Sequence, residues 1–134
     1  MIVADTNLIT GAYLPGQHTE AIRSVMMKDA DWVAPYLWRS EFRNVLWQYL
    51  KHGKMSMDSA KRVAMLAEER MRGQEFWTPA DRILDLSALS GCTSYDCEFV
   101  FVAMDLKVSL VTLEKKVLKQ FPDIAISPEG FVSR

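Results

Sequence analysis

The chain has 134 residues, a formal net charge of −1, 49% hydrophobic residues and 25% charged residues. These values are typical of one globular domain, expected over residues 1–134, and they exclude a generally basic nucleic-acid-binding surface. No run approaches the ~18 apolar residues of a membrane span, and no basic leader precedes an apolar stretch, so we expect a cytoplasmic protein without a membrane partner. Cys92 and Cys97 lack zinc-like spacing with histidine and are expected to be reduced thiols.

The first seven residues predict a short buried strand that ends at Asp5-Thr6-Asn7. The carboxyl ends of parallel strands are where α/β proteins place ligands and chemistry, so Asp5 would stand at the mouth of a site. The alternative is that Asp5 or Asn7 only caps the helix that follows. Other acids at the ends of neighbouring strands would favour a site residue over a simple helix cap.

The next segments alternate between helix and strand. A short apolar piece covers residues 8–14, and Thr19 is the expected N-cap of a helix that extends to about residue 29. Residues 32–34 predict a second strand, which Pro35 ends. This order of strand, helix and strand is typical of a parallel sheet.

Residues 36–51 predict a helix with one apolar stripe. Glu41 lies at the margin of this stripe, near the helix start, and either pairs with Arg39 or Arg43 or faces the same rim as Asp5. A second helix, capped by Ser56, extends to about residue 71, so the two form an αα-hairpin. The hairpin carries eight of the 16 basic residues, which are either a solvated surface or contacts for phosphate.

The second half of the chain continues the α/β pattern. Residues 74–77, 109–112 and 124–126 predict strands, and residues 80–89 and 115–121 predict helices, the first with Ile83, Leu84 and Leu86 facing inward. Ser94 is the expected N-cap of a helix that is apolar nearly all round and therefore buried. Asp96 lies in its first turn, as a helix-start acid or as a site residue. Residues 127–131 are expected to form an edge-like tail.

Four acids thus follow strands or begin helices at one edge of the predicted sheet: Asp5, Glu41, Asp96 and Glu114. Clustered carboxylates raise one another's pKa, and a hard divalent cation removes this repulsion. Oxygen ligands without histidine or cysteine favour Mg²⁺ or Mn²⁺ over zinc. Such a cation with nearby arginine and lysine indicates phosphodiester hydrolysis.

Four segments carry a resemblance to a known family. They are Ile2-Val3-Ala4-Asp5-Thr6-Asn7, Arg39-Ser40-Glu41-Phe42-Arg43-Asn44-Val45-Leu46, Ser94-Tyr95-Asp96 and Leu110-Val111-Thr112-Leu113-Glu114. In this order the chain resembles a PIN domain, and among PIN domains the VapC-type toxins of toxin–antitoxin pairs. The resemblance implies a three-layer α/β/α fold with a central, mostly parallel sheet of four to five strands and a protruding αα-hairpin.

The same resemblance implies a Mg²⁺- or Mn²⁺-dependent endoribonuclease that leaves a 3′-hydroxyl and a 5′-phosphate, forms a homodimer and binds a cognate antitoxin. Asp5, Glu41 and Asp96 match the first three acids of the family. Asn7 and Thr112 match polar positions that place the substrate, a role also expected of Arg39 and Arg43. Where the family usually has Thr-x-Asp, this chain has Thr112-Leu113-Glu114, whose carboxylate is displaced by about 1.5 Å, one covalent bond.

Two other functions remain open from the sequence. Glu114 and the basic hairpin are compatible with a PIN-like RNA-binding or adaptor protein that does not cleave. A phosphohydrolase of the haloacid-dehalogenase type would use Asp5 as a nucleophile. That type requires a second aspartate two residues later, where this chain has Asn7.

Overall fold

The computed structural model describes residues 1–134 and contains one five-stranded sheet in the order β3-β2-β1-β4-β5. Every neighbouring pair of strands is parallel. The strands are β1 (Ile2–Ala4), β2 (Trp32–Pro35), β3 (Glu75–Phe76), β4 (Leu110–Val111) and β5 (Ala125–Ile126). The α/β class, the parallel sheet and the number of strands are those expected from the sequence.

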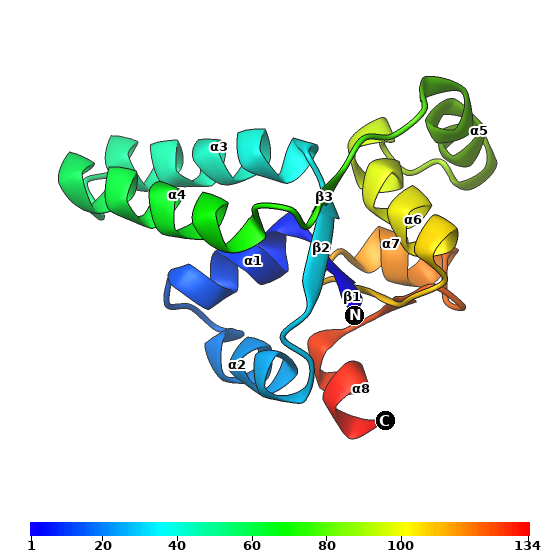
Figure 1. Cartoon of the computed structure of the whole chain (residues 1–134), viewed down its shortest axis with the longest axis horizontal. Coiled ribbons are helices and arrows are strands. Elements are labelled where there is room, and N and C mark those ends of the chain that lie inside the picture. The colour runs from blue at the N-terminus through cyan, green and yellow to red at the C-terminus, as the bar shows by residue number, and fades with distance from the viewer.

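Helices cover both faces of the sheet (Figure 1). They are α1 (Thr6–Tyr13), α2 (Thr19–Lys28), α3 (Leu37–Lys51), α4 (Met57–Met71), α5 (Ala80–Ser90), α6 (Ser94–Leu106), α7 (Lys115–Gln120) and α8 (Pro128–Ser133). Helices α1, α3 and α4 pack against β1 and β2 from one side, and α6 packs against β1, β2 and β4 from the other, with α5 outside it. None of the helices is both long enough and apolar enough to cross a membrane.

Strands β1 and β2 and helix α6 lie in the hydrophobic core of the protein. All residues of β1 and β2 are buried, as expected for parallel strands covered on both faces. Helix α6 is buried over Cys97 and 99–103, which confirms the interpretation of its apolar sequence. Both cysteines are buried free thiols.

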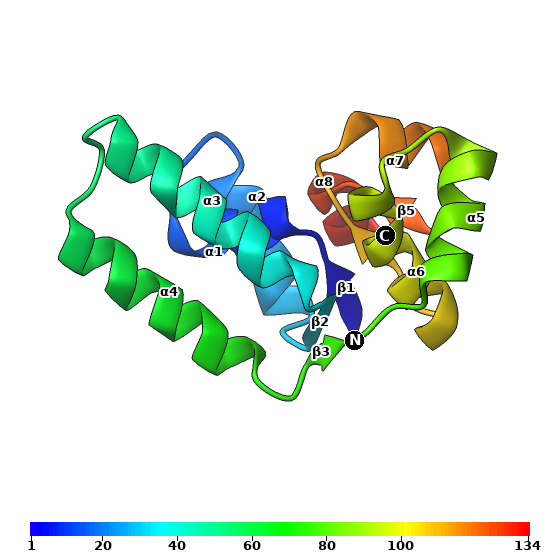
Figure 2. The same ribbon diagram turned by 90° about the horizontal axis from the view of Figure 1, so that it is seen from above.

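The hairpin of α3 and α4 extends away from the sheet (Figure 2). Trp38, Phe42 and Leu46 form the buried stripe of α3, and Ser56 caps α4 by accepting a hydrogen bond from the backbone N–H of Ser59. The predicted αα-hairpin and its cap are therefore confirmed. The hairpin also brings the start of α3 close to the carboxyl edge of the sheet.

Several local predictions were wrong. Thr93, not Ser94, caps α6 by accepting a hydrogen bond from the Asp96 N–H, and α2 already includes Thr19. Leu84 is 65% exposed, because α5 is an outer helix whose inward stripe consists of Ile83 and Leu86.

The C-terminal tail is also different from its prediction. Residues 128–133 form the short helix α8 rather than an edge-like extension. Ser127 accepts a hydrogen bond from the Gly130 N–H, and Pro128 occupies the first helical turn, where its missing N–H has no consequence. Helix α8 packs against α2.

Candidate active site

Four acidic side chains from four separate segments of the chain line one cavity of about 410 Å³ at the carboxyl edge of the sheet. Asp5 follows β1, Glu41 lies in α3, Asp96 lies in the first turn of α6, and Glu114 precedes α7. The remaining lining residues are Thr6, Asn7, Thr10, Asn44 and Val45. The structure thus brings together all four acids selected from the sequence.

Asp5 is both a helix cap and a cavity residue. Its Oδ1 accepts a hydrogen bond from the Thr6 N–H at 2.7 Å, and its Oδ2 accepts one from Thr112 Oγ1 at 2.6 Å. The side chain is almost completely removed from water, and this burial raises its pKa from 3.8 to about 7. The two hydrogen bonds oppose this rise, while the charges of Glu41 and Asp96 add to it.

Glu41 is held toward the cavity by Thr6. Thr6 Oγ1 donates a hydrogen bond to Glu41 Oε1 at 2.6 Å. Burial raises the pKa of Glu41, the bond from Thr6 opposes this rise, and the charges of Asp96 and Glu98 increase it. Thr6 and Glu98 were not among the predicted site residues. The contact between Thr6 and Glu41 joins residues 35 positions apart, so no local pattern indicates it.

Asp96, in the first turn of α6, and Glu114, between β4 and α7, complete the acidic rim. Burial raises the pKa of Asp96, and the charge of Glu114 raises it further. The hydrogen bond with Thr93 and the charge of Lys116 lower it. The Glu114 side chain is exposed and makes no capping bond to α7, so it is free to turn toward the other acids.

Asn7 and Thr112 organise the loop after β4. Asn7 Oδ1 accepts a hydrogen bond from the Leu113 N–H at 3.3 Å, and the Glu114 N–H donates to Thr112 Oγ1 at 2.9 Å. Asn7 lines the cavity, whereas Thr112 is fully buried behind Asp5. Thr112 therefore orients the Asp5 carboxylate and the Glu114 backbone. Its predicted role in positioning the substrate remains a prediction.

The donor atoms at this cavity fit a hard divalent cation. Carboxylate and amide oxygens are the ligands that Mg²⁺ and Mn²⁺ prefer, and the cavity offers no imidazole or thiol. No group of three or more Asp, Glu, His or Cys side chains is already arranged as a metal site. Coordination by several acids therefore requires rotation of side chains, for which the flexible stems of Glu41 and Glu114 are suited.

Arg39 and Arg43 do not line the cavity and have carboxylate partners elsewhere. Arg39 binds Glu75 through Nε and Nη2 at 2.6 and 2.7 Å, and the Trp38 indole N–H donates to the same carboxylate. Arg43 Nη2 lies 2.5 Å from Glu68 Oε1. The predicted substrate-positioning role of the two arginines remains a prediction.

Replacing Arg39 with alanine is expected to lower the free energy of unfolding by about 2–4 kcal/mol, because it leaves the buried Glu75 carboxylate without its cation. Denaturation in urea measures this change. Arg43→Ala is the matched control, because its exposed pair with Glu68 should contribute less than about 1 kcal/mol. Equal losses for the two variants would contradict a structural role specific to Arg39.

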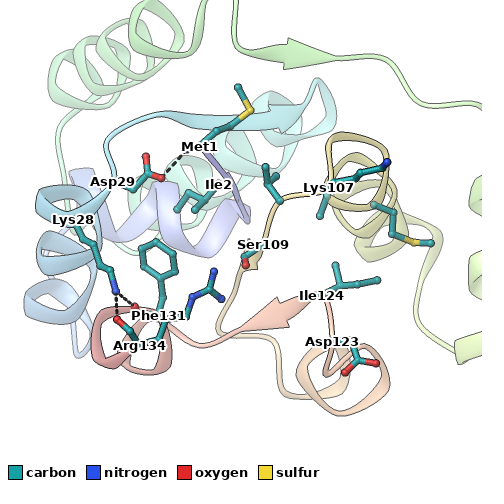
Figure 3. A pocket seen from close by; sticks show the side chains of 13 residues that line it. Met1, Ile2, Lys28, Asp29, Lys107, Ser109, Asp123, Ile124, Phe131 and Arg134 are labelled. Carbon is teal, nitrogen blue, oxygen red and sulfur yellow. Dashed lines mark hydrogen bonds and ion pairs between the residues drawn. The ribbon is translucent and has the colours of Figure 1, made fainter.

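A larger cavity, of about 910 Å³, lies at the opposite edge of the sheet, where β1 and β4 begin (Figure 3). Three of its charged groups are paired with each other or with the backbone. Lys28 Nζ donates to the carbonyl oxygens of Phe131 and Arg134, both at 2.7 Å, and the Met1 ammonium group contacts Asp29 at 2.7 Å. None of the predicted site residues lies here, so this cavity is not the acidic site.

Comparisons with known proteins agree with this architecture. No protein-family model matches the chain. The chain is similar to Ribonuclease VapC3 from Pyrobaculum aerophilum, with 24% identity over 124 residues that cover 90% of this chain and 95% of that protein.

Two solved structures share the fold. The crystal structure of PAE2754 from Pyrobaculum aerophilum gives a TM-score of 0.78 at 19% identity and covers 99% of this chain and 94% of that one. FitAcB from Neisseria gonorrhoeae gives 0.74 at 14% identity and covers 96% and 98%. The fold is therefore the PIN-like α/β fold. The resemblance of the chain to VapC-type ribonucleases is likewise confirmed, by the similarity to VapC3 along nearly its whole length.

Proposed function

We propose that this protein is a Mg²⁺- or Mn²⁺-dependent endoribonuclease and the toxin of a toxin–antitoxin pair. The observation that carries the proposal is the convergence of Asp5, Glu41, Asp96 and Glu114 on one 410 Å³ cavity. Burial, together with the charges of neighbouring acids, raises the pKa values of Asp5, Glu41 and Asp96, so their charged forms are unfavourable at neutral pH unless a cation binds there. The similarity of the chain to Ribonuclease VapC3 supports the same activity.

In this mechanism the four acids would hold the cation, and the surrounding hydroxyls would orient them. A bound Mg²⁺ or Mn²⁺ supplies a water of lowered pKa and stabilises charge on the phosphoryl oxygens. Thr112 fixes Asp5, and Thr6 fixes Glu41, each through a bond of 2.6 Å. Asn7 and Asn44 offer amide groups that can bind the ribose or phosphate of an RNA strand in the cavity.

The partners follow from the same proposal. RNA is the substrate, a cognate antitoxin is the inhibitor, and a homodimer is the working form. Toxin and substrate would meet in the cytoplasm. Residues 1–134 would form one domain that holds all four acids at one edge of its sheet.

The decisive test is cleavage of single-stranded RNA by the purified protein. With Mg²⁺ or Mn²⁺ we expect internal cuts that leave 3′-hydroxyl and 5′-phosphate ends, identified by end-specific ligation and labelling. Addition of EDTA should abolish cleavage, and restoring excess Mn²⁺ should recover it. Cleavage that persists in EDTA would contradict the proposed chemistry.

Glu114 distinguishes this function from that of a non-cleaving RNA-binding or adaptor protein. Because Glu114 lines the cavity and its charge reaches Asp96, the nuclease should retain cleavage in Glu114→Asp and lose about 10- to 100-fold in Glu114→Gln. A non-cleaving protein would retain RNA on a filter without cutting it. A gain of cleavage in Glu114→Asp would then assign the inactivity to the longer side chain.

A further inference from the structure

Two aromatic side chains, Tyr36 and Trp77, stack on each other where β2 and β3 end. Their ring centroids are 4.4 Å apart and their planes differ by 29°. Trp77 is 82% exposed although it is stacked on one side, so its other face is open to solvent. An indole held in a fixed orientation with one free face is a surface on which a second flat ring can stack.

The aromatic pair follows the ends of β2 and β3, at the same carboxyl edge of the sheet as the acidic cavity. Tyr36 immediately precedes α3, the helix that carries Glu41, and its N–H donates to the Phe76 carbonyl at 3.1 Å, which holds the ends of β2 and β3 together. On the other side of Trp77, Thr78 Oγ1 donates to Glu98 Oε1 at 2.6 Å. The charge of Glu98 is in turn felt by Glu41.

The segment that carries Trp77 also connects the two walls of the cavity. It leaves β3 and crosses from the α3 side of the molecule to α5 and α6 on the other side (Figure 1 and Figure 2). Glu41 comes from the first wall and Asp96 from the second. A strand of RNA that leaves the cavity along this segment would pass Trp77.

We propose that Trp77, backed by Tyr36, is a stacking platform for one nucleobase of a single-stranded RNA whose neighbouring phosphodiester lies in the acidic cavity. This inference rests on the proposed function and names its substrate class. Bases of a duplex are stacked on their neighbours and are not available, whereas every unpaired base has a free face. The platform would position the strand without reading its sequence.

The surroundings of Trp77 favour a base over an apolar protein surface. Polar and charged groups flank the aromatic pair: Thr78, next to Trp77, is hydrogen-bonded to Glu98, and the guanidinium carbon of Arg39 lies 6.0 Å from the centre of the Tyr36 ring. A base carries no net charge, so it can approach Glu98 and Glu41 without the repulsion that a phosphate would meet. One flat ring with polar neighbours matches a base better than an extended apolar interface.

The test compares two probes of equal charge on the full-length protein. One is a fluorescently labelled oligouridylate, and the other is an abasic ribose-phosphate strand of the same length, both measured by anisotropy in Ca²⁺. The wild type should bind the oligouridylate roughly tenfold more tightly, and Trp77→Ala should lose this preference without weaker binding of the abasic strand. Trp77→Phe should keep part of the preference, because phenylalanine retains an aromatic face.

Trp47→Ala is the matched control, since Trp47 is also an exposed tryptophan, 53% accessible, but lies farther along α3. This variant should retain the full preference for oligouridylate. Failure of the wild type to distinguish the two strands, or an unchanged preference in Trp77→Ala, would overturn the platform. A changed oligomeric state in Trp77→Ala with unchanged RNA affinity would also overturn it and would assign Trp77 to a protein interface.

The binding test of Trp77 and the cleavage test of the proposed nuclease can fail independently of each other. A Trp77-dependent preference in a protein that cuts no RNA in Mn²⁺ supports the platform and contradicts the nuclease. Cleavage in Mn²⁺ by a protein without this preference contradicts the platform and leaves the nuclease intact.

Discussion

Asp5→Asn is expected to lower the rate of RNA cleavage by at least about 10³-fold. The same substitution is expected to stabilise the cation-free protein at pH 8. The loss of activity follows because the variant lacks the most buried of the four carboxylates, and a cation's charge stabilisation amounts to several kcal/mol. The gain in stability follows from the same burial. Asparagine is as good a helix cap as aspartate and carries no charge to desolvate.

The sign and size of this gain follow from the pKa of Asp5. Burial raises the pKa from 3.8 to about 7, so the folded protein binds more protons than the unfolded chain and loses stability as the pH rises through this interval. The penalty is absent below about pH 4 and complete above pH 7, where it is roughly 4 kcal/mol. We expect Asp5→Asn to raise the Tm in EDTA by roughly 5–15 °C at pH 8 and by little at pH 4.

Melting curves of the wild type, Asp5→Asn and Asp105→Asn in EDTA measure this effect. Asp105 is an exposed carboxylate near the end of α6, so its amide variant should melt like the wild type at both pH values. A lower Tm for Asp5→Asn than for the wild type at pH 8 would show that the hydrogen bonds from Thr6 and Thr112 stabilise the charged form more than burial penalises it.

The four acids could be selected from the sequence because each occupies a position that local pattern defines. Asp5 and Glu114 follow strands, Asp96 lies in the first turn of a helix, and Glu41 lies near the start of another. In a parallel sheet all these positions lie at one edge, so their convergence follows from topology without knowledge of any contact. The cap function of Asp5 and its place in the cavity were treated as alternatives, but one carboxylate has two oxygens and serves both.

The hydroxyls that orient the acids could not be predicted in the same way. Thr6 reaches Glu41 across 35 positions and Thr112 reaches Asp5 across 107. Such bonds depend on how α3 and β4 pack against β1, and a single sequence contains no local pattern that specifies them. Trp77 ends the predicted strand 74–77, and no local pattern in the sequence shows that its ring stacks on that of Tyr36.

The errors in local structure also have physical causes. Leu84 was placed inside because apolar residues at helical spacing were assumed to share one face, but α5 packs only through Ile83 and Leu86. Residues 127–131 were predicted to form an edge-like tail, although Pro128 is compatible with either structure. In a helix the same proline is favourable at the first turn, directly after a capping serine such as Ser127.

Addition of Mg²⁺ or Mn²⁺ is expected to raise the Tm of the wild type at pH 8 and to have almost no effect at pH 5. A cation that binds only the folded state stabilises it by about 2.7 kcal/mol at a concentration 100 times Kd. The acids must be deprotonated to bind it, and the pKa of Asp5 is about 7. Below this value the apparent affinity should fall tenfold for each pH unit from Asp5 alone, and more steeply where Glu41 and Asp96 also take up protons, because their pKa values are raised as well.

The number of protons released on cation binding directly measures the coupling between cation binding and deprotonation of the acids. Calorimetric titration with Mn²⁺ near pH 6.5, in buffers of different ionisation enthalpy, should show protons leaving the wild type on binding and fewer leaving Asp5→Asn. Asp105→Asn should release as many protons as the wild type, because its carboxylate is exposed and outside the cavity. Cation binding without proton release would place the ion away from Asp5. Binding that releases protons in the wild type but not in Asp5→Asn would tie the buried carboxylate at the end of β1 to the chemistry of the cavity.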